Sequence, residues 1–186
     1  RSEFDWETIQ EKIAKNPLIK NKNAKPRIMT ITQSTYDGIV YNDEVIKEKL
    51  DGKVDILHFD EAWLPHAAFS PFYSDMHAID RNKPRTKKSM VFATHSTHKL
   101  LAGISQASQI CIQDSETEKL DRSSFNEAFM MHTSTSPQYA IIASCDVAAA
   151  MMEGRAGKAL VEESIAEAVY FRRAMREVGK NYGDWW

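Results

Sequence analysis

The segment with the most chemical potential is VFATHSTHKLLAG, residues 91–103. In it, an apolar run gives way to hydroxyl and imidazole side chains, followed by Lys99 and then by another apolar stretch. A lysine in partly apolar surroundings can attack a carbonyl and form a Schiff base. The neighbouring hydroxyls and imidazoles suit an anionic group such as a phosphate. We therefore expect Lys99 to take part in chemistry.

A second candidate is Asp60, the acid that ends the apolar run VDILHFD at residues 54–60. Ligands of open parallel sheets bind beyond the carboxyl ends of the strands, so Asp60 and Lys99 could face one crevice. Pyridoxal phosphate needs a lysine for its aldehyde, an acid for its ring nitrogen and small polar donors for its phosphate. The two candidates together indicate this cofactor, although each alone is a weak signal.

The apolar periodicity predicts the elements that must position these residues. We expect helices over residues 5–16, 43–52, 137–154 and 157–183, and strands over 27–34, 54–60, 88–96 and 108–113. A helix or turn is expected at 99–106, and another helix after a cap at Asp121 or Ser123. Strands that alternate with helices, followed by helices alone, predict an α/β fold with a mostly parallel sheet flanked by helices.

The composition excludes several classes of protein. The 186 residues are 42% hydrophobic and 27% charged, which predicts a folded globular chain. A net charge of −2 argues against partners such as nucleic acid or a membrane surface, and no apolar run is long enough to span a bilayer. Cys111 and Cys145 fit buried free thiols in a reducing cytoplasm. His95 and His98 lack further ligands at suitable spacing, so we expect no metal site.

Three further expectations concern regions away from these candidates. The polar, basic segment 74–89 is predicted to be the most mobile part of the chain. Four methionines are predicted to lie on helices and to fill the hydrophobic core: Met130, Met131, Met151 and Met152. The final Trp185 and Trp186 need a partner surface, which suggests a fragment of a longer polypeptide, unless they pack back on this domain.

Four motifs, in this order along the chain, carry a resemblance to a known family. They are STYDGIVYN (34–42), HFDEAW (58–63), THSTHKLLAGISQAS (94–108) and FNEAFMMHTSTSPQYAIIAS (125–144). Together they resemble the bacterial ornithine/lysine/arginine decarboxylases, which are pyridoxal-phosphate-dependent enzymes with the aspartate-aminotransferase fold (fold type I). The resemblance runs over nearly the whole chain.

The resemblance implies roles for residues around the cofactor ring. Lys99 would bind the cofactor covalently, and Asp60 would pair with the pyridine nitrogen and keep it protonated. Ala62, two residues further along the strand and so on the same face, would pack its methyl group against the ring. Trp63 would lie near the hydroxyl side of the ring.

The resemblance also implies contacts to the cofactor's phosphate. Ser96 and His98 would bind it within the chain, with turn capping as the alternative role. Thr133 or Ser134 would reach the phosphate of a neighbouring subunit, because family sites form at a dimer interface. Which of the two does so stays open, as does the alternative that these hydroxyls only cap the helix after Pro137.

The resemblance implies that these 186 residues contain about half of a cofactor site. Residues 1–186 would be part of the pyridoxal-phosphate-binding large domain, without its N-terminal portion and the C-terminal domain. The full-length parent would be a cytoplasmic homodimer or higher oligomer that decarboxylates arginine, lysine or ornithine, whereas the fragment alone would be inactive. Two alternatives remain: another fold-type-I enzyme such as an aminotransferase, and a non-catalytic assembly segment.

Overall fold

The structure, a computed structural model, describes residues 5–21 and 24–183. The expectation about Trp185 and Trp186 therefore falls outside the described residues. The helices are α1 (Trp6–Lys15), α2 (Asp43–Leu50), α3 (Thr97–Leu100), α4 (Arg122–His132), α5 (Tyr139–Met152) and α6 (Gly154–Tyr182). The strands are β1 (Ile28–Thr32), β2 (Ile56–Asp60), β3 (Met90–His95) and β4 (Gln109–Gln113), and two short 3-10 helices follow β2, η1 (Ala67–Phe69) and η2 (Pro71–Tyr73).

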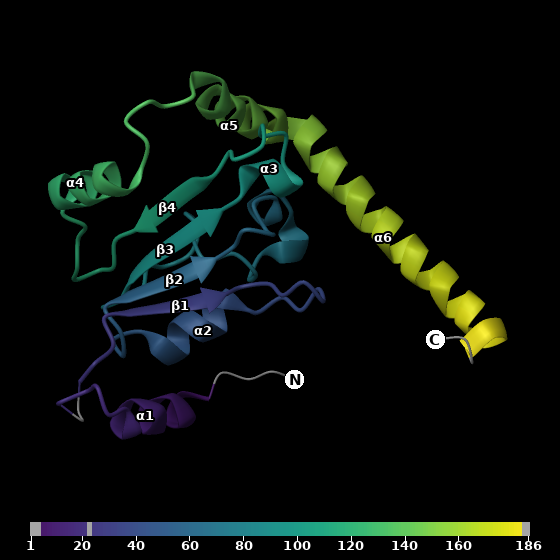
Figure 1. The fold of residues 1–186 in the computed structure, drawn as a ribbon. Helices are drawn as coiled ribbons and strands as arrows, with labels where there is room; N and C mark the ends of the chain where they lie inside the picture. Colours follow the sequence, from purple (N-terminus) through teal and green to yellow (C-terminus); the bar gives the residue numbers. More distant parts are fainter. Residues whose placement is uncertain (1–4, 22–23, 184–186) are drawn as a thin grey trace.

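The four strands form one sheet in the order β1-β2-β3-β4 (Figure 1). The first three strands run parallel and β4 runs antiparallel to β3. Asp60, the last residue of β2, lies between Thr32 of β1 and Thr94 of β3. The predicted α/β class with a mostly parallel sheet flanked by helices is confirmed, and all four predicted strands form.

The hydrophobic core covers one face of this sheet. Side chains alternate between the faces of a strand, and the alternation buries Leu57 and Phe59 of β2 completely. Ile46 and Leu50 of α2, four residues apart on one side of the helix, pack into the same core. The opposite face of β2 carries the half-buried His58 and Asp60. The carboxyl end of β2 therefore presents Asp60 away from the core.

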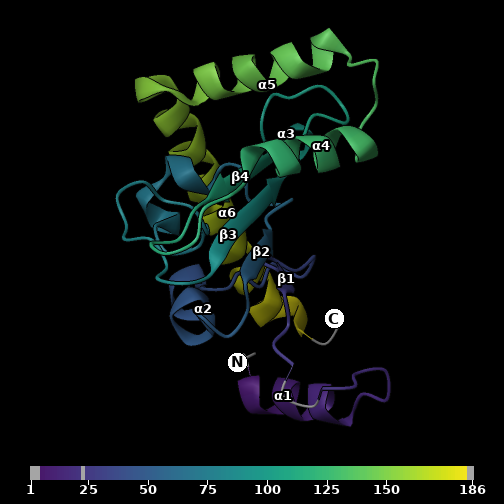
Figure 2. The ribbon, with the colours of Figure 1, turned by 90° about the vertical axis from the view of Figure 1, so that its left-hand side faces the viewer.

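Two helix boundaries differ from the predicted ones. The helical turn expected at 99–106 is α3, which begins earlier, at Thr97, and is a single turn. The last helix begins at Gly154 rather than at Gly157. Gly154 has a φ of +72° where the chain bends from α5 into α6 (Figure 2), and a Cβ at Gly157 would lie 2.2 Å from the Met152 carbonyl oxygen. The α5–α6 elbow therefore depends on these two glycines.

The four methionines do not all fill a core. Met152 is 8% exposed, as predicted, but Met131 is 79% exposed, and Met130 and Met151 are about half exposed. The reason is that α4 and α5 follow β4, the strand at one edge of the sheet, and that α6 extends away from the sheet (Figures 1 and 2). Their apolar residues have no second layer within the described part of the chain.

The segment 74–89, predicted to be mobile, is tied to the core at both ends. Ala78 and Ser89 are fully buried. The Lys47 ammonium donates to the Ala78 carbonyl at 2.9 Å, and the Ser89 N–H donates to the Asp51 carboxylate at 2.9 Å. Among the described residues, no helix has the length and hydropathy needed to cross a bilayer.

Candidate functional site

The two candidate residues lie on neighbouring elements at the same edge of the sheet. Asp60 ends β2, and β3 leads through Ser96 into α3, which carries Lys99. The Glu61 N–H donates to the Thr94 carbonyl at 2.9 Å, which extends the pairing of β2 and β3 up to this edge. The carboxyl ends of parallel strands therefore bring the two motifs together, as the sequence predicts.

The side chain of Lys99 lies over an aromatic ring. Its Nζ is 4.5 Å from the centre of the Trp63 ring, and the edge of the Trp63 ring contacts Tyr36 at a centroid distance of 5.4 Å. Lys99 itself is exposed. Of the apolar surroundings expected for it, the structure provides the face of the Trp63 ring. Tyr36, which belongs to the STYDGIVYN motif, joins the site through Trp63, and no local pattern signals that contact.

Asp60 holds the turn that follows its strand. Its Oδ1 accepts the N–H of Ala62 at 3.2 Å. Ala62 lies in that turn, beyond the end of β2, so the strand alternation used to place it on the face of Asp60 does not apply. On the Asp60 face of the sheet, the His58 ring bridges the Thr30 and Thr94 hydroxyls at 3.2 Å each.

The two predicted phosphate-binding residues lie around the start of α3. Ser96 is the N-cap of α3, but its side chain makes no capping hydrogen bond, which argues against capping as its role. The Nδ1 of His98 lies 2.9 Å from the Ala107 carbonyl oxygen and donates to it. A phosphate would therefore meet Nε2, which donates only in the charged imidazolium. The Thr97 hydroxyl is buried without a hydrogen-bond partner.

Thr133 and Ser134 lie in the connection between α4 and α5. The Thr133 hydroxyl donates to the Phe129 carbonyl at 3.0 Å, and the Ser134 hydroxyl accepts the Ser136 N–H at 3.1 Å. Neither caps α5, whose N-cap is Gln138. Within residues 5–21 and 24–183, no hydrogen bond joins them to residues 60–63 or 96–99, so their role toward a neighbouring subunit stays a prediction.

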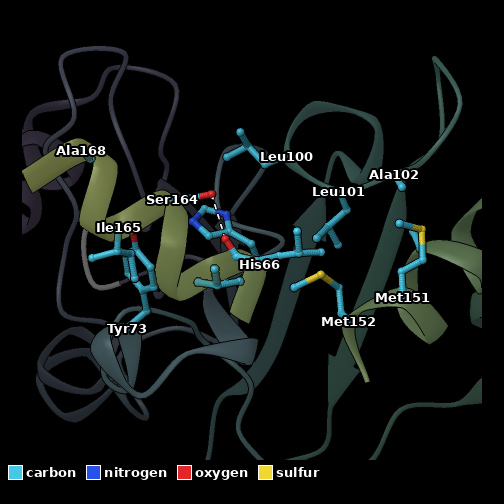
Figure 3. A pocket seen from close by; sticks show the side chains of 13 residues that line it. His66, Tyr73, Leu100, Leu101, Ala102, Met151, Met152, Ser164, Ile165 and Ala168 are labelled. Carbon is cyan, nitrogen blue, oxygen red and sulfur yellow. Dashed lines mark hydrogen bonds between the residues drawn. The ribbon is translucent and has the colours of Figure 1, made fainter. Parts of the chain in front are cut away.

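Two cavities lie next to the site rather than in it. An apolar cavity of about 310 Å³ lies between α3, α5 and α6, and His66 points into it (Figure 3). Burial lowers the pKa of His66, whose Nδ1 has no hydrogen-bond partner. A second cavity, of about 1150 Å³ and with a mixed polar and apolar lining, is lined by Glu61 and His95 among others. Neither cavity is lined by Asp60 or Lys99.

Glu61 and His95 form an ion pair that sequence reasoning missed. The Nε2 of His95 lies 2.6 Å from the Glu61 carboxylate, and the Glu61 side chain is 1% exposed. Of the cysteines, Cys111 and Cys145 are both free and partly buried. The described residues contain no cluster of three or more acidic, histidine or cysteine side chains able to hold a metal ion.

The residues present at this edge fit pyridoxal phosphate. Lys99 offers an exposed amine above an aromatic face, and Asp60 offers a carboxylate on the half-buried face of the sheet. Ser96 and His98 follow directly from β3, with a free hydroxyl and a free ring nitrogen. This donor set matches the aldehyde, ring nitrogen and phosphate of the cofactor.

Comparisons with known proteins identify relatives of this chain. The chain is 52% identical, over its full length, to lysine decarboxylase LdcA from Pseudomonas aeruginosa, and 46% identical to the biodegradative arginine decarboxylase of Escherichia coli over 98% of its length. It spans about a quarter of each of these relatives. The structure of lysine decarboxylase A from Pseudomonas aeruginosa superposes with a TM-score of 0.86 over 96% of this chain and 24% of that one.

A second solved structure, the constitutive lysine decarboxylase of Escherichia coli, superposes with a TM-score of 0.81 at 41% identity, over 96% of this chain and 23% of that one. The family model described as "Orn/Lys/Arg decarboxylase, major domain" matches residues 1–184. This match covers nearly every residue, including both motifs that meet at the sheet edge, and the chain therefore belongs to the Orn/Lys/Arg decarboxylase major-domain family.

Proposed function

We propose that this chain is part of a pyridoxal-phosphate-dependent decarboxylase that converts arginine, lysine or ornithine into the corresponding amine and CO2. The observation that carries the proposal is the position of Lys99, over Trp63 and next to the β2 end that holds Asp60. The relatives named above are lysine and arginine decarboxylases, and an Escherichia coli ornithine decarboxylase is 32% identical.

The residues of this chain would hold and tune the cofactor. Lys99 would bind its aldehyde carbon, and the Asp60 carboxylate would hold a proton on the ring nitrogen. Trp63 and the methyl group of Ala62 would restrict the position of the ring. When bound, pyridoxal phosphate supplies an electron acceptor that stabilises the carbanion left after CO2 departs.

The phosphate would be held from two chains. Ser96 and the imidazolium of His98 would donate to it from the start of α3. Thr133 or Ser134 would reach the phosphate of a neighbouring subunit, for which both hydroxyls are exposed. The exposed apolar side chains of α4, α5 and α6 support a homodimer or higher oligomer, since such surfaces mark interfaces.

Residues 1–186 would then form part of the fold-type-I large domain of a cytoplasmic enzyme. On this proposal the chain alone is inactive and binds the cofactor weakly, because it spans about a quarter of its relatives. Turnover by the isolated chain would contradict this part of the proposal.

The test uses the full-length protein that carries this chain, with CO2 release measured from arginine, lysine and ornithine. Lys99→Ala should abolish turnover and the visible absorbance of the bound cofactor. Asp60→Asn should keep the absorbance but lower kcat, on the order of a hundredfold or more, because the ring nitrogen loses its anionic partner. Amino transfer to a keto acid without CO2 release would favour an aminotransferase. Absence of cofactor absorbance in the unmodified protein would favour an assembly segment.

A further inference from the structure

A buried cluster of titratable side chains lies behind the candidate site, on the core side of the sheet. It consists of Asp43 at the start of α2, Glu61 after β2 and His95 at the end of β3. Asp43 is 0% exposed and Glu61 is 1% exposed. The proposed function assigns no role to any of the three.

Glu61 is the acid of the cluster with two hydrogen-bond partners. Its Oε1 accepts the Ala78 N–H at 2.6 Å, and its Oε2 lies 2.6 Å from the Nε2 of His95. Burial by itself would lower the pKa of His95, but its interactions with Cys111 and the Glu61 carboxylate outweigh burial and raise the pKa to about 9. His95 is therefore an imidazolium at neutral pH, and Glu61 is its carboxylate partner.

Asp43, unlike Glu61, has no hydrogen-bond donor at its carboxyl group. Both of its carboxylate oxygens are buried without a donor, and so is the Oε1 of the neighbouring Gln33, whose Nε2 donates to the Tyr41 and Met76 carbonyls. Burial, and then the charge of Glu61, raise the pKa of Asp43 to about 9, although Gln33 and Lys47 oppose this. A proton on Asp43 supplies the donor that this acceptor-rich pocket lacks.

The other charges around Asp43 are paired among themselves. Lys47 contacts the Glu44 carboxylate at 2.7 Å, and Lys83 contacts Asp75 at 2.6 Å. On the loop side, His77 donates to the Tyr73 carbonyl and lies 3.9 Å from Asp80. Among the described residues, His95 is the cation paired with Glu61, and one proton shared between Glu61 and Asp43 leaves the cluster neutral.

The cluster joins the two strand ends that carry the candidate site. Glu61 directly follows Asp60, and His95 directly precedes Ser96 at the entrance to α3. We propose that Asp43 and Glu61 share one proton, and that the Glu61–His95 pair is a positioning device that fixes Asp60 and Lys99 relative to each other. The positioning role rests on the proposed function, whereas the shared proton does not.

The shared proton is tested by infrared spectroscopy of the full-length protein with 13C-labelled aspartate at neutral pH. A protonated carboxyl band should shift with the label and vanish in Asp43→Asn, which should fold normally because an amide replaces a neutral acid. Asp51→Asn is the matched control: Asp51 accepts three backbone N–H groups and is ionised, so its replacement should leave the band. A spectrum that Asp43→Asn leaves unchanged would overturn the shared proton.

The positioning role is tested by cofactor titration, followed through visible absorbance and its pH profile. Glu61→Gln and His95→Gln should each weaken cofactor binding about tenfold and shift the profile, since each leaves a buried partner unpaired. The double variant joins two neutral amides by a hydrogen bond and should recover most of the loss. Folded single variants with unchanged affinity and profile would overturn the positioning role. A wild-type protein that binds no cofactor would instead refute the proposed function and leave the infrared test decisive for the proton.

Discussion

The ammonium of Lys99 lies 4.5 Å from the centre of the Trp63 ring. This contact joins α3 to the turn after β2, and so joins the lysine motif to the motif that contains Asp60. The attraction between a cation and an aromatic face orients the amine above the ring plane at the sheet edge.

We predict that Trp63→Ala weakens cofactor binding severalfold, because Lys99 loses the ring face that orients it, worth roughly 0.5–1 kcal/mol at an exposed site. Trp63→Phe keeps an aromatic face and should retain most of the affinity. Cofactor titration of the full-length protein measures this. Trp6→Phe is the control. The Trp6 ring also faces a lysine, with the Lys53 Nζ 5.2 Å from its centre, but it lies in α1, away from the candidate site. Equal affinities for Trp63→Ala and wild type would contradict the prediction.

Ser96→Ala and His98→Ala should weaken binding of pyridoxal phosphate far more than binding of pyridoxal, which lacks the phosphate. The reason is that the proposed function gives both side chains a contact with the phosphate and none with the ring. Comparing the two dissociation constants in each variant separates phosphate contacts from general damage to α3. Parallel losses for both ligands would instead indicate the structural role of His98, its hydrogen bond to the Ala107 carbonyl.

Gly103→Ala should loosen the segment that follows Lys99. An added Cβ would lie 2.9 Å from the Ala107 Cβ and 3.1 Å from the Thr97 carbonyl carbon, so α3 must shift. We expect a loss of about 1–3 kcal/mol in the free energy of unfolding and weaker cofactor binding. Gly179 lies near the end of α6, and a Cβ added there would meet no atom within 4 Å. Gly179→Ala should therefore be neutral or stabilising. Urea unfolding of both variants checks the contrast.

Stability should fall as the pH rises through about 9. The pKa of His95 is raised from 6.5 to about 9 in the folded chain, so the contribution of its ion pair is complete below pH 6.5 and is lost above about 9. Asp43 acts in the same direction, because the folded state retains its proton well above the ordinary value. The His95 part amounts to at most about 3 kcal/mol.

Urea unfolding between pH 6 and 10 measures this dependence, and the Glu61→Gln/His95→Gln double variant should show a flatter curve. Asp51 should give a pH dependence of the opposite sign. Burial by itself would raise the pKa of Asp51, but the backbone N–H groups of Ser89, Lys88 and Lys87 outweigh burial and lower it. Its contribution is present at neutral pH and is lost only in acid. A wild-type curve that stays level up to pH 10 would refute the assignment to His95.

Some features of this protein could be read from local sequence. The strands around β2 and β3 follow from runs of apolar residues, and Asp60 and the Lys99 motif stand where those runs end. Short parallel strands place their carboxyl ends at one edge, so the convergence of the two motifs follows from the element order. The α/β class could be predicted for the same reason.

Other features depended on packing between distant segments. The pairing of Glu61 with His95 and the neutral state of Asp43 need burial on the core side, which residue types alone do not reveal. Ala62 lies outside the strand, in a turn where the Asp60 carboxylate accepts its N–H. The exposure of Met131 reflects where α4 lies, not its own apolar character.

The sequence by itself determined the elements and the identity of the reactive side chains, because hydrophobic periodicity and side-chain chemistry are local properties. The tertiary structure decided which groups are desolvated and which become partners, as in the one proton for Asp43 and Glu61. Charge states in a protein interior depend on the summed contacts of residues far apart in the chain, and those contacts exist only after folding.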